Sequence, residues 1–369
     1  MPISAQEFLR RYKAIREIMT NNSLDCLLIT GRADYFSRGN VRYLTNLGNG
    51  GYVIFPAEGS PIFLTSPAQT ASPKVRRIGP VLDLLQLKPV SDPLEGIKSE
   101  LLRFDKGNNI GIVGMTEISV PTYRALQELF HDRLVDATWI FAQLRPVKSA
   151  EEIEKIRTAA FIADEVCAML IEMIRPGLSD YEIYGTVKKK IYEMGSEYSM
   201  ELIDADSTNM NMWWNPSGDK LEAQGTLFME ITPSCEGYYA QLPVCLPVGK
   251  YSPSVRELVA VSKKATEAGV ALLHPGTRVA DLYSALVKTV QEHSFLAPLR
   301  PGHAIGLDVI DFWSITESNE TILEPGMTLA MHPPVLRELG GEAVGMGYTY
   351  LITETGAEKL SKIDLHKLG

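Results

Sequence analysis

The chain has 369 residues, of which 45% are hydrophobic and 22% charged, and its formal net charge is −9. This length favours two domains, and the composition is that of an ordinary soluble globular protein. The acidic balance, with no basic run longer than the three lysines at 188–190, argues against nucleic acid or an anionic membrane as a partner.

The N-terminal segment carries charge throughout, and no uninterrupted apolar stretch reaches transmembrane length. Four widely spaced cysteines form neither a zinc-binding nor a disulfide pattern; they are Cys26, Cys167, Cys235 and Cys245. These features predict a cytoplasmic protein with buried, reduced thiols.

Up to about residue 140, helical segments alternate with short apolar runs that are bounded by Gly, Pro and Asn. These runs are CLLIT (26–30), YVIF (52–55), PIFLT (61–65) and IGIVG (110–114). Apolar runs of this length are typical of buried strands, and strands separated by helices indicate an α/β layer with a partly parallel sheet. We therefore predict an α/β domain over residues 1–143.

The second domain, over residues 144–369, begins with a helix signal. Ser149 and Glu152 form a capping box pattern, and apolar residues follow at helical spacing until Pro176-Gly177 stops the helix.

The second domain then nearly repeats itself. Residues 176–189 (PGLSDYEIYGTVKK) match residues 275–288 (PGTRVADLYSALVK) at an offset of 99, and residues 221–230 match residues 323–332 at an offset of 102. Two ordered matches at almost the same offset predict a duplicated α+β unit with pseudo-twofold symmetry. The repeat places Glu230 and His332 at equivalent strand ends that face a shared interface.

Six ordered motifs give the chain a family resemblance. They are NVRYLTN (40–46), LRPVKSAEEIEKIR (144–157), NPSGDKLEAQGTLF (215–228), GHAIGLDV (302–309), LEPGMTLAMHPPV (323–335) and LITETGAEKL (351–360). In these motifs the sequence resembles the creatinase, prolidase and aminopeptidase P superfamily. The resemblance implies an α/β N-terminal domain followed by an α+β pita-bread domain with an internal repeat.

The metal-dependent members that the chain resembles bind two divalent ions through two Asp, one His and two Glu. Carried over one at a time, these positions fall on Glu230, Gln241, His303, His332 and Gly347. The bridging carboxylates are therefore lost, and the remaining negative charge is too small for two dications. The resemblance thus implies a divergent member that is unlike a standard dinuclear metallopeptidase.

The resemblance also suggests residues that bind substrate. Gln241 is a neutral group suited to orienting a substrate. Trp213 and Trp214 stand where many members have a His, and one of them is expected to wall the pocket. Arg42 and Tyr43 either reach the active site of a neighbouring subunit in a homodimer or serve the structure of their own domain. Asp308 and Asp311 are expected to be solvated turn residues.

The first hypothesis is a metal-independent, creatinase-like hydrolase that needs no cofactor and cleaves a carbon–nitrogen bond in a small, apolar or aromatic molecule. In this hypothesis His303 shuttles a proton, while Glu230 and His332 polarise and protonate the substrate.

Two alternatives remain open at this point. The first is a mononuclear metal hydrolase or lyase in which Glu230, His303 and His332 hold a single divalent ion. The second is a non-catalytic module that only binds a small molecule.

Overall fold

The structure is a computed structural model, and it describes residues 2–48, 50–72, 79–205 and 215–368. The chain forms two compact units, Met1–Arg145 and Pro146–Gly369. In the described part of the chain, no helix combines the length and the apolar character that a membrane span requires.

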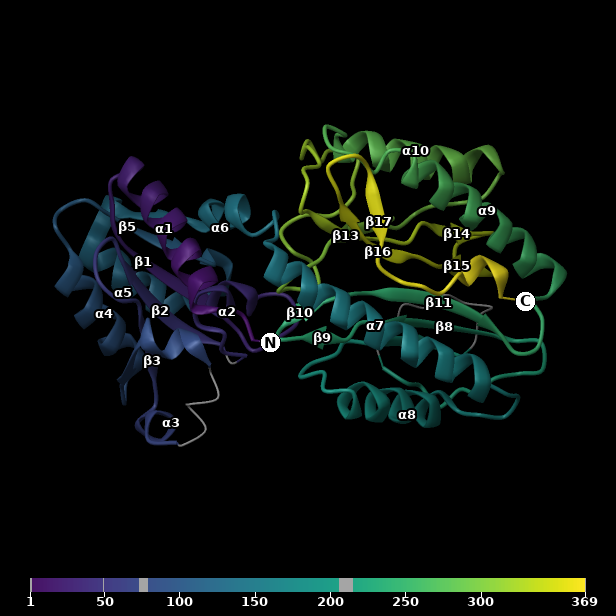
Figure 1. The fold of residues 1–369 in the computed structure, drawn as a ribbon, viewed down its shortest axis with the longest axis horizontal. Helices are drawn as coiled ribbons and strands as arrows, with labels where there is room; N and C mark the ends of the chain where they lie inside the picture. Colours follow the sequence, from purple (N-terminus) through teal and green to yellow (C-terminus); the bar gives the residue numbers. More distant parts are fainter. Residues whose placement is uncertain (1, 49, 73–78, 206–214, 369) are drawn as a thin grey trace. The chain divides into compact units, whose positions relative to one another are not determined.

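The first unit is built on a six-stranded sheet in the order β4-β3-β2-β1-β5-β6 (Figure 1). The central strand β1 pairs with β2 in antiparallel fashion and with β5 in parallel fashion. The strands are β1 (Leu24–Gly31), β2 (Gly51–Pro56), β3 (Ile62–Thr65), β4 (Gln86–Pro89), β5 (Asn109–Val113) and β6 (Leu134–Asp136). The four predicted apolar runs are therefore strands, and the predicted partly parallel sheet is confirmed.

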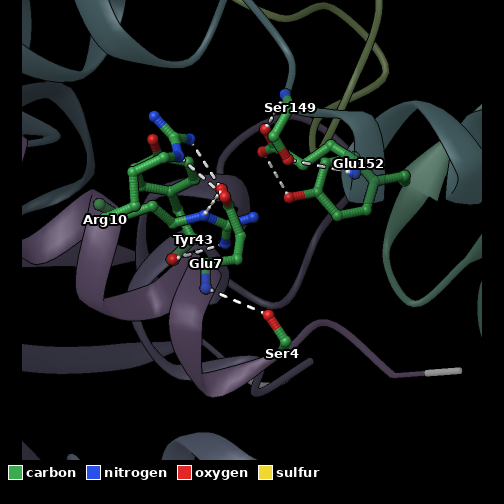
Figure 2. A network of polar contacts seen from close by, with 8 residues as sticks. Ser4, Glu7, Arg10, Tyr43, Ser149 and Glu152 are labelled. Atoms are coloured by element: carbon green, nitrogen blue, oxygen red, sulfur yellow. Dashed lines mark hydrogen bonds and ion pairs between the residues drawn. The ribbon is translucent and has the colours of Figure 1, made fainter.

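Helices flank this sheet, and α1, α4 and α5 each bury apolar residues, whereas the four-residue α3 has no buried residue. They are α1 (Ala5–Asn21), α2 (Gly39–Thr45), α3 (Pro67–Thr70), α4 (Pro93–Phe104), α5 (Val120–Phe130) and α6 (Thr138–Leu144). Polar contacts fix α1, as Figure 2 shows: Ser4 caps the helix, and the Glu7 carboxylate accepts hydrogen bonds from Arg10 and Arg11. Arg11 in turn donates to the carbonyl of Tyr43 in α2, at 2.9 Å.

The second unit begins with α7 (Ala150–Met173), whose capping box is the predicted one. Ser149 and Glu152 bond reciprocally, as Figure 2 shows. The other oxygen of the Glu152 carboxylate accepts a hydrogen bond from the Tyr238 hydroxyl at 2.8 Å. Tyr238 lies in β10 (Tyr238–Tyr239), which pairs with β9 (Ser234–Cys235). This helix cap therefore also anchors a strand pair to α7.

The remaining elements fall into two halves, with helices outside and strands between them (Figure 1). The first half contains α8 (Asp180–Glu193), β7 (Leu202–Asp204), β8 (Thr226–Ile231) and β11 (Leu242–Pro247). The second half contains α9 (Pro253–Val270), α10 (Val279–Glu292), β12 (Gly302–Ala304), β13 (Thr328–Met331), β14 (Pro334–Leu336), β15 (Ala343–Gly345), β16 (Tyr348–Ile352) and β17 (Ala357–Lys359). The strands form the sheets β11-β8-β7, β12-β13-β16-β17 and β14-β15.

The structure confirms the duplication that the sequence predicts. Helices α8 and α10 begin and end at residues that differ by 99, and β8 and β13 begin at residues that differ by 102. The backbone hydrogen bonds repeat as well: Gly177 N–H donates to the Leu221 carbonyl, and Gly276 N–H donates to the Leu323 carbonyl. Both glycines have positive φ, 85° and 90°, which only glycine adopts at little cost.

The expectation for Asp308 and Asp311 is wrong, because both side chains are buried, with exposed fractions of 5% and 1%. Asp311 forms an ion pair with Lys148 at 3.0 Å, and both side chains are 1% exposed. No local sequence pattern indicates this partner, because it lies 163 positions away. A buried carboxylate needs such a partner, since desolvation otherwise disfavours its charge.

We predict that Lys148→Met destabilises the protein by about 3–5 kcal/mol, because it leaves the Asp311 carboxylate buried without its cation. Urea unfolding followed by circular dichroism measures this change. The control is Lys189→Met, which removes a pair with Glu193 whose side chains are 73% and 58% exposed; its effect should stay within about 0.5 kcal/mol. Equal effects of the two variants would contradict the prediction.

Candidate active site

Strand β8 positions Glu230 among apolar neighbours. All six residues of the strand are buried, and Glu230 is 7% exposed. In the register it lies opposite Pro243 of β11 and Leu202 of β7. The carboxyl group therefore sits in a central strand with apolar residues on both sides.

Gln241, which directly precedes β11, holds the Glu230 carboxyl. Its side-chain Nε2 donates to Oε2 of Glu230 at 2.9 Å. Its backbone is fixed by the Thr349 hydroxyl of β16, which accepts from Gln241 N–H at 2.8 Å and donates to the Gln241 carbonyl at 2.9 Å. One hydroxyl thus holds both backbone groups of the residue that orients Glu230.

His303 and His332 form the second pair of the site. His303 lies in β12 opposite Ala330 of β13, and His332 follows the last residue of β13. Their rings meet edge to face, with centroids 5.5 Å apart and an interplanar angle of 70°. The backbone N–H of His332 donates to the Pro301 carbonyl at 2.8 Å, which fixes the two segments side by side.

Gly347 joins the two pairs through its backbone. Its N–H donates to the carbonyl of Pro243, the register partner of Glu230, at 3.1 Å. On its other side a Cβ would collide with the Met331 carbonyl and lie 2.6 Å from Cα of His332. The position where the metal-dependent family carries a Glu therefore has no room for a side chain in this backbone.

Burial controls the protonation of the carboxyl group. Desolvation raises the pKa of Glu230 to about 7, and the positive charge of Arg300 opposes this rise. The group can therefore hold a proton near neutral pH, where an ordinary glutamate is ionised.

Burial has the opposite effect on the two imidazoles. Desolvation lowers the pKa of His303 to about 4; the carbonyls of Ala304 and Val309 oppose the change, and the charge of Arg300 adds to it. The pKa of His332 falls to about 3, through desolvation and the charges of His303 and Arg300. Both rings are therefore neutral at pH 7.

The hydrogen bond of His303 defines its tautomer. Nδ1 lies 3.0 Å from the Ala304 carbonyl oxygen, and because a carbonyl only accepts, Nδ1 must carry the proton. In the neutral ring the lone pair is then on Nε2.

Two buried polar atoms of the site have no partner among the residues that the structure describes. They are Oε1 of Gln241 and Nε2 of His332. A buried polar atom without a partner costs about 1–3 kcal/mol, and such atoms in a candidate site are suited to a bound substrate or water.

The side chains at these positions do not fit a metal centre. One carboxyl group, one amide, two imidazoles and a glycine stand where the family carries four carboxylates and one His. Across residues 2–48, 50–72, 79–205 and 215–368, no three His, Cys, Asp or Glu side chains are grouped closely enough to hold an ion. The three residues of the mononuclear alternative, Glu230, His303 and His332, are therefore not arranged as a ligand set.

The sequence also predicts that Arg42, Tyr43, Trp213 and Trp214 bind substrate, and the structure describes the first two of these residues. Tyr43 lies within the first unit, 1% exposed, with its ring 5.7 Å from that of Phe141; Arg42 in the same helix is 4% exposed. Their role toward a neighbouring subunit stays a prediction. Trp213 and Trp214 lie outside the described residues.

Sequence reasoning missed Thr349 and Arg300. The contact of Thr349 with Gln241 spans 108 positions, so no local pattern indicates it. Arg300 stands three residues before His303, and a basic residue so close to a functional histidine was a signal that could have been used.

Comparison with known proteins identifies the family. Residues 154–354 match the metallopeptidase family M24, and residues 11–147 match the creatinase/prolidase N-terminal domain. The chain belongs to the M24 family, within the creatinase and prolidase superfamily.

Relatives of similar length cover both units. The chain is 26% identical to an ectoine hydrolase of Halomonas elongata, over 98% of this chain and 96% of that protein. It is 26% identical to a creatinase of a Bacillus species, over 97% and 91%, and 23% identical to a Xaa-Pro dipeptidase of Pyrococcus horikoshii, over 96% and 97%. All three are hydrolases, and a hydrolase is the class that they support for this chain.

Solved structures show the same fold. The prolidase from Pyrococcus horikoshii OT3 matches with a TM-score of 0.81 at 20% identity, over 96% of this chain and 99% of that one. The X-Pro aminopeptidase from Thermotoga maritima matches with a TM-score of 0.83 at 18% identity, over 96% and 98%. The predicted combination of a creatinase-type N-terminal domain and a pita-bread domain is confirmed.

We predict that Gly347→Ala lowers stability by about 1–3 kcal/mol, because the added Cβ must push against the backbone of Met331 and His332. Chemical denaturation measures the loss. Gly356→Ala is the matched control, since a Cβ there meets nothing within 4 Å. A Gly347→Ala protein as stable as this control would show that the strands separate easily and would contradict the prediction.

Proposed function

We propose that this protein is a metal-independent hydrolase that cleaves a carbon–nitrogen bond in a small molecule. The observation that carries the proposal is the buried Glu230–Gln241 pair, in which a carboxyl group able to hold a proton at neutral pH replaces a metal ligand. Proton transfer by positioned groups then takes the place of activation by two ions.

Glu230 is the proposed general acid. When protonated it can donate to the nitrogen that leaves, and its Gln241 partner suits both protonation states. The amide NH₂ donates to Oε2 of Glu230 in either state, which leaves the other carboxyl oxygen to carry the proton.

His303 is the proposed base and proton shuttle. Its neutral ring presents a lone pair on Nε2, which can accept a proton from the attacking water. His332 lies against it, and its buried Nε2 is available to hydrogen-bond the substrate.

The proposed reaction balances without a further reactant. The water oxygen forms a bond to the substrate carbon as one water proton passes to His303. The carbon–nitrogen bond breaks as Glu230 protonates the nitrogen. The imidazolium then returns its proton to the Glu230 carboxylate, directly or through water, and both groups regain their starting states.

The substrate class follows from the relatives together with the free acceptor on Gln241. The amide oxygen suits an N–H of an amide, amidine or guanidine, and the printed names of two relatives, ectoine hydrolase and creatinase, motivate an assay of ectoine and creatine beside a Xaa-Pro dipeptide. We propose a compound of this kind as the substrate.

We predict a bell-shaped pH dependence of kcat/KM for whichever compound is hydrolysed. Activity rises as pH increases through about 4, where His303 becomes neutral, and falls as pH increases through about 7, where Glu230 loses its proton. Glu230→Gln should lower kcat by roughly 10²–10⁴ and abolish the alkaline limb. Initial rates between pH 4 and 9 measure both effects.

The control for that experiment is Glu222→Gln, which changes an exposed carboxylate and should keep the profile of the wild-type protein. An alkaline limb that persists in Glu230→Gln would assign the proton to another group. Near-normal turnover of His303→Ala in a folded protein would refute the role of His303.

We also predict that protein purified from medium supplemented with zinc, manganese and cobalt contains close to zero ions per chain after dialysis, because the site lacks bridging carboxylates. Plasma mass spectrometry measures the content, and turnover should be unchanged by EDTA. One ion per chain, lost in His332→Ala, would establish the mononuclear alternative instead.

A further inference from the structure

Thr349 links the sheet that carries His303 to the residue that holds Glu230. It lies in β16 opposite Ala330 of β13, and Ala330 in turn lies opposite His303 of β12. Side chains of directly opposed residues point to the same face of a sheet. The side chains of Thr349 and His303 therefore share one face of the second sheet, and both residues are 2% exposed.

The Thr349 hydroxyl fixes the backbone of Gln241, which lies between two strands. Strand β10 ends at Tyr239 and β11 begins at Leu242, so Gln241 belongs to neither. Its N–H donates to the Thr349 hydroxyl at 2.8 Å, and the same hydroxyl donates to its carbonyl at 2.9 Å. A hydroxyl can accept and donate at the same time, which an apolar side chain cannot do. One side chain thus fixes a backbone that lies outside the strand pairing.

The fixed backbone of Gln241 determines where its side-chain amide lies, and this amide contacts the proposed acid. Its Nε2 donates to Oε2 of Glu230 at 2.9 Å, and both residues are buried. This bond occupies one carboxyl oxygen and leaves the other to carry the proton. The hydrogen bonds from Thr349 through Gln241 to Glu230 are all 2.9 Å or shorter, so a change at Thr349 reaches the carboxyl group through a single intermediate residue.

We propose that Thr349 is a positioning residue for the acid step: its hydroxyl fixes Gln241, and Gln241 directs the Glu230 proton toward the nitrogen that leaves. Proton transfer needs the donor and acceptor at hydrogen-bond distance, so a displaced carboxyl group lowers the rate while the substrate still binds. Because Thr349 and His303 share one face of the same sheet, the hydroxyl also fixes the acid relative to the base. This inference rests on the proposed function and names the residue that places its acid.

Two substitutions at Thr349 separate the hydroxyl from the shape of the side chain. Thr349→Val keeps the shape and should lower kcat by roughly 10- to 100-fold while KM stays within a few-fold, for whichever of ectoine, creatine and a Xaa-Pro dipeptide is hydrolysed. Thr349→Ser keeps the hydroxyl and should keep kcat within a few-fold. Gln241→Met removes the amide and should reproduce the loss, which keeps the test decisive if Thr349→Val does not fold. Wild-type kcat in Thr349→Val or Gln241→Met, or an equal loss in Thr349→Ser, would show that the inference is wrong.

A double-mutant cycle separates positioning from a general loss of structure. In protein that already carries Glu230→Gln, Thr349→Val should lower kcat by no more than a few-fold, because the group that it positions no longer has a proton to give. The matched control is Thr328→Val, which removes a buried hydroxyl that donates to the Ile305 carbonyl at 2.6 Å from the neighbouring strand β13. Its effect on kcat should be the same with and without Glu230→Gln. Equal effects of Thr349→Val in the two backgrounds would overturn the inference.

Nuclear magnetic resonance tests the link without any substrate. In protein labelled with ¹⁵N in the glutamine side chains, the Gln241 amide signal is identified by its loss in Gln241→Met. Thr349→Val should move this signal toward that of a solvent-exposed glutamine, and Thr349→Ser should leave it in place; an unmoved signal in Thr349→Val would refute the link. Normal turnover of Glu230→Gln would refute the proposed acid and the role of Thr349 with it. Lost turnover of Glu230→Gln beside normal turnover of Thr349→Val would retain the hydrolase and reject the role of Thr349 alone.

Discussion

The hydrogen bond between Gly347 N–H and the Pro243 carbonyl joins the two halves of the second unit at the candidate site. It joins β11 of the first half to the start of β16 in the second half, at the positions opposite Glu230 and beside His332. A Cβ at position 347 would collide with Met331 and His332 of the second half. The same glycine that closes the two halves therefore leaves no space for the glutamate that metal-dependent relatives carry there.

Closure of the two halves also determines the electrostatics of the site. Strands that pack this closely exclude water from Glu230 and from the two histidines, and desolvation favours the neutral form of each group. The carboxyl group is pushed toward protonation, and the imidazoles are pushed toward deprotonation. A single environment thus prepares an acid and a base, which general acid–base catalysis requires at the same pH.

Much of this arrangement was predictable because it is periodic or repeated. The offsets of 99 and 102 residues placed Glu230 and His332 at equivalent strand ends, and the apolar runs indicated the strands of the first unit. Contacts between distant residues were not predictable. The hydrogen bonds between Thr349 and the Gln241 backbone join segments that no local pattern connects. The same holds for the Lys148–Asp311 ion pair, and for this reason Asp311 was wrongly expected to be solvated.

The charge of the site argues for one kind of ligand over another. The metal-dependent relatives compensate two dications with several carboxylates, whereas here one partly protonated carboxyl group and two neutral rings lie within reach of a guanidinium. These groups carry little net negative charge, so they offer a dication few of the anionic oxygen ligands that hard divalent ions require. Fewer carboxylates at these positions mean less negative charge to hold two dications, which is the physical basis for the proposed metal-independent chemistry.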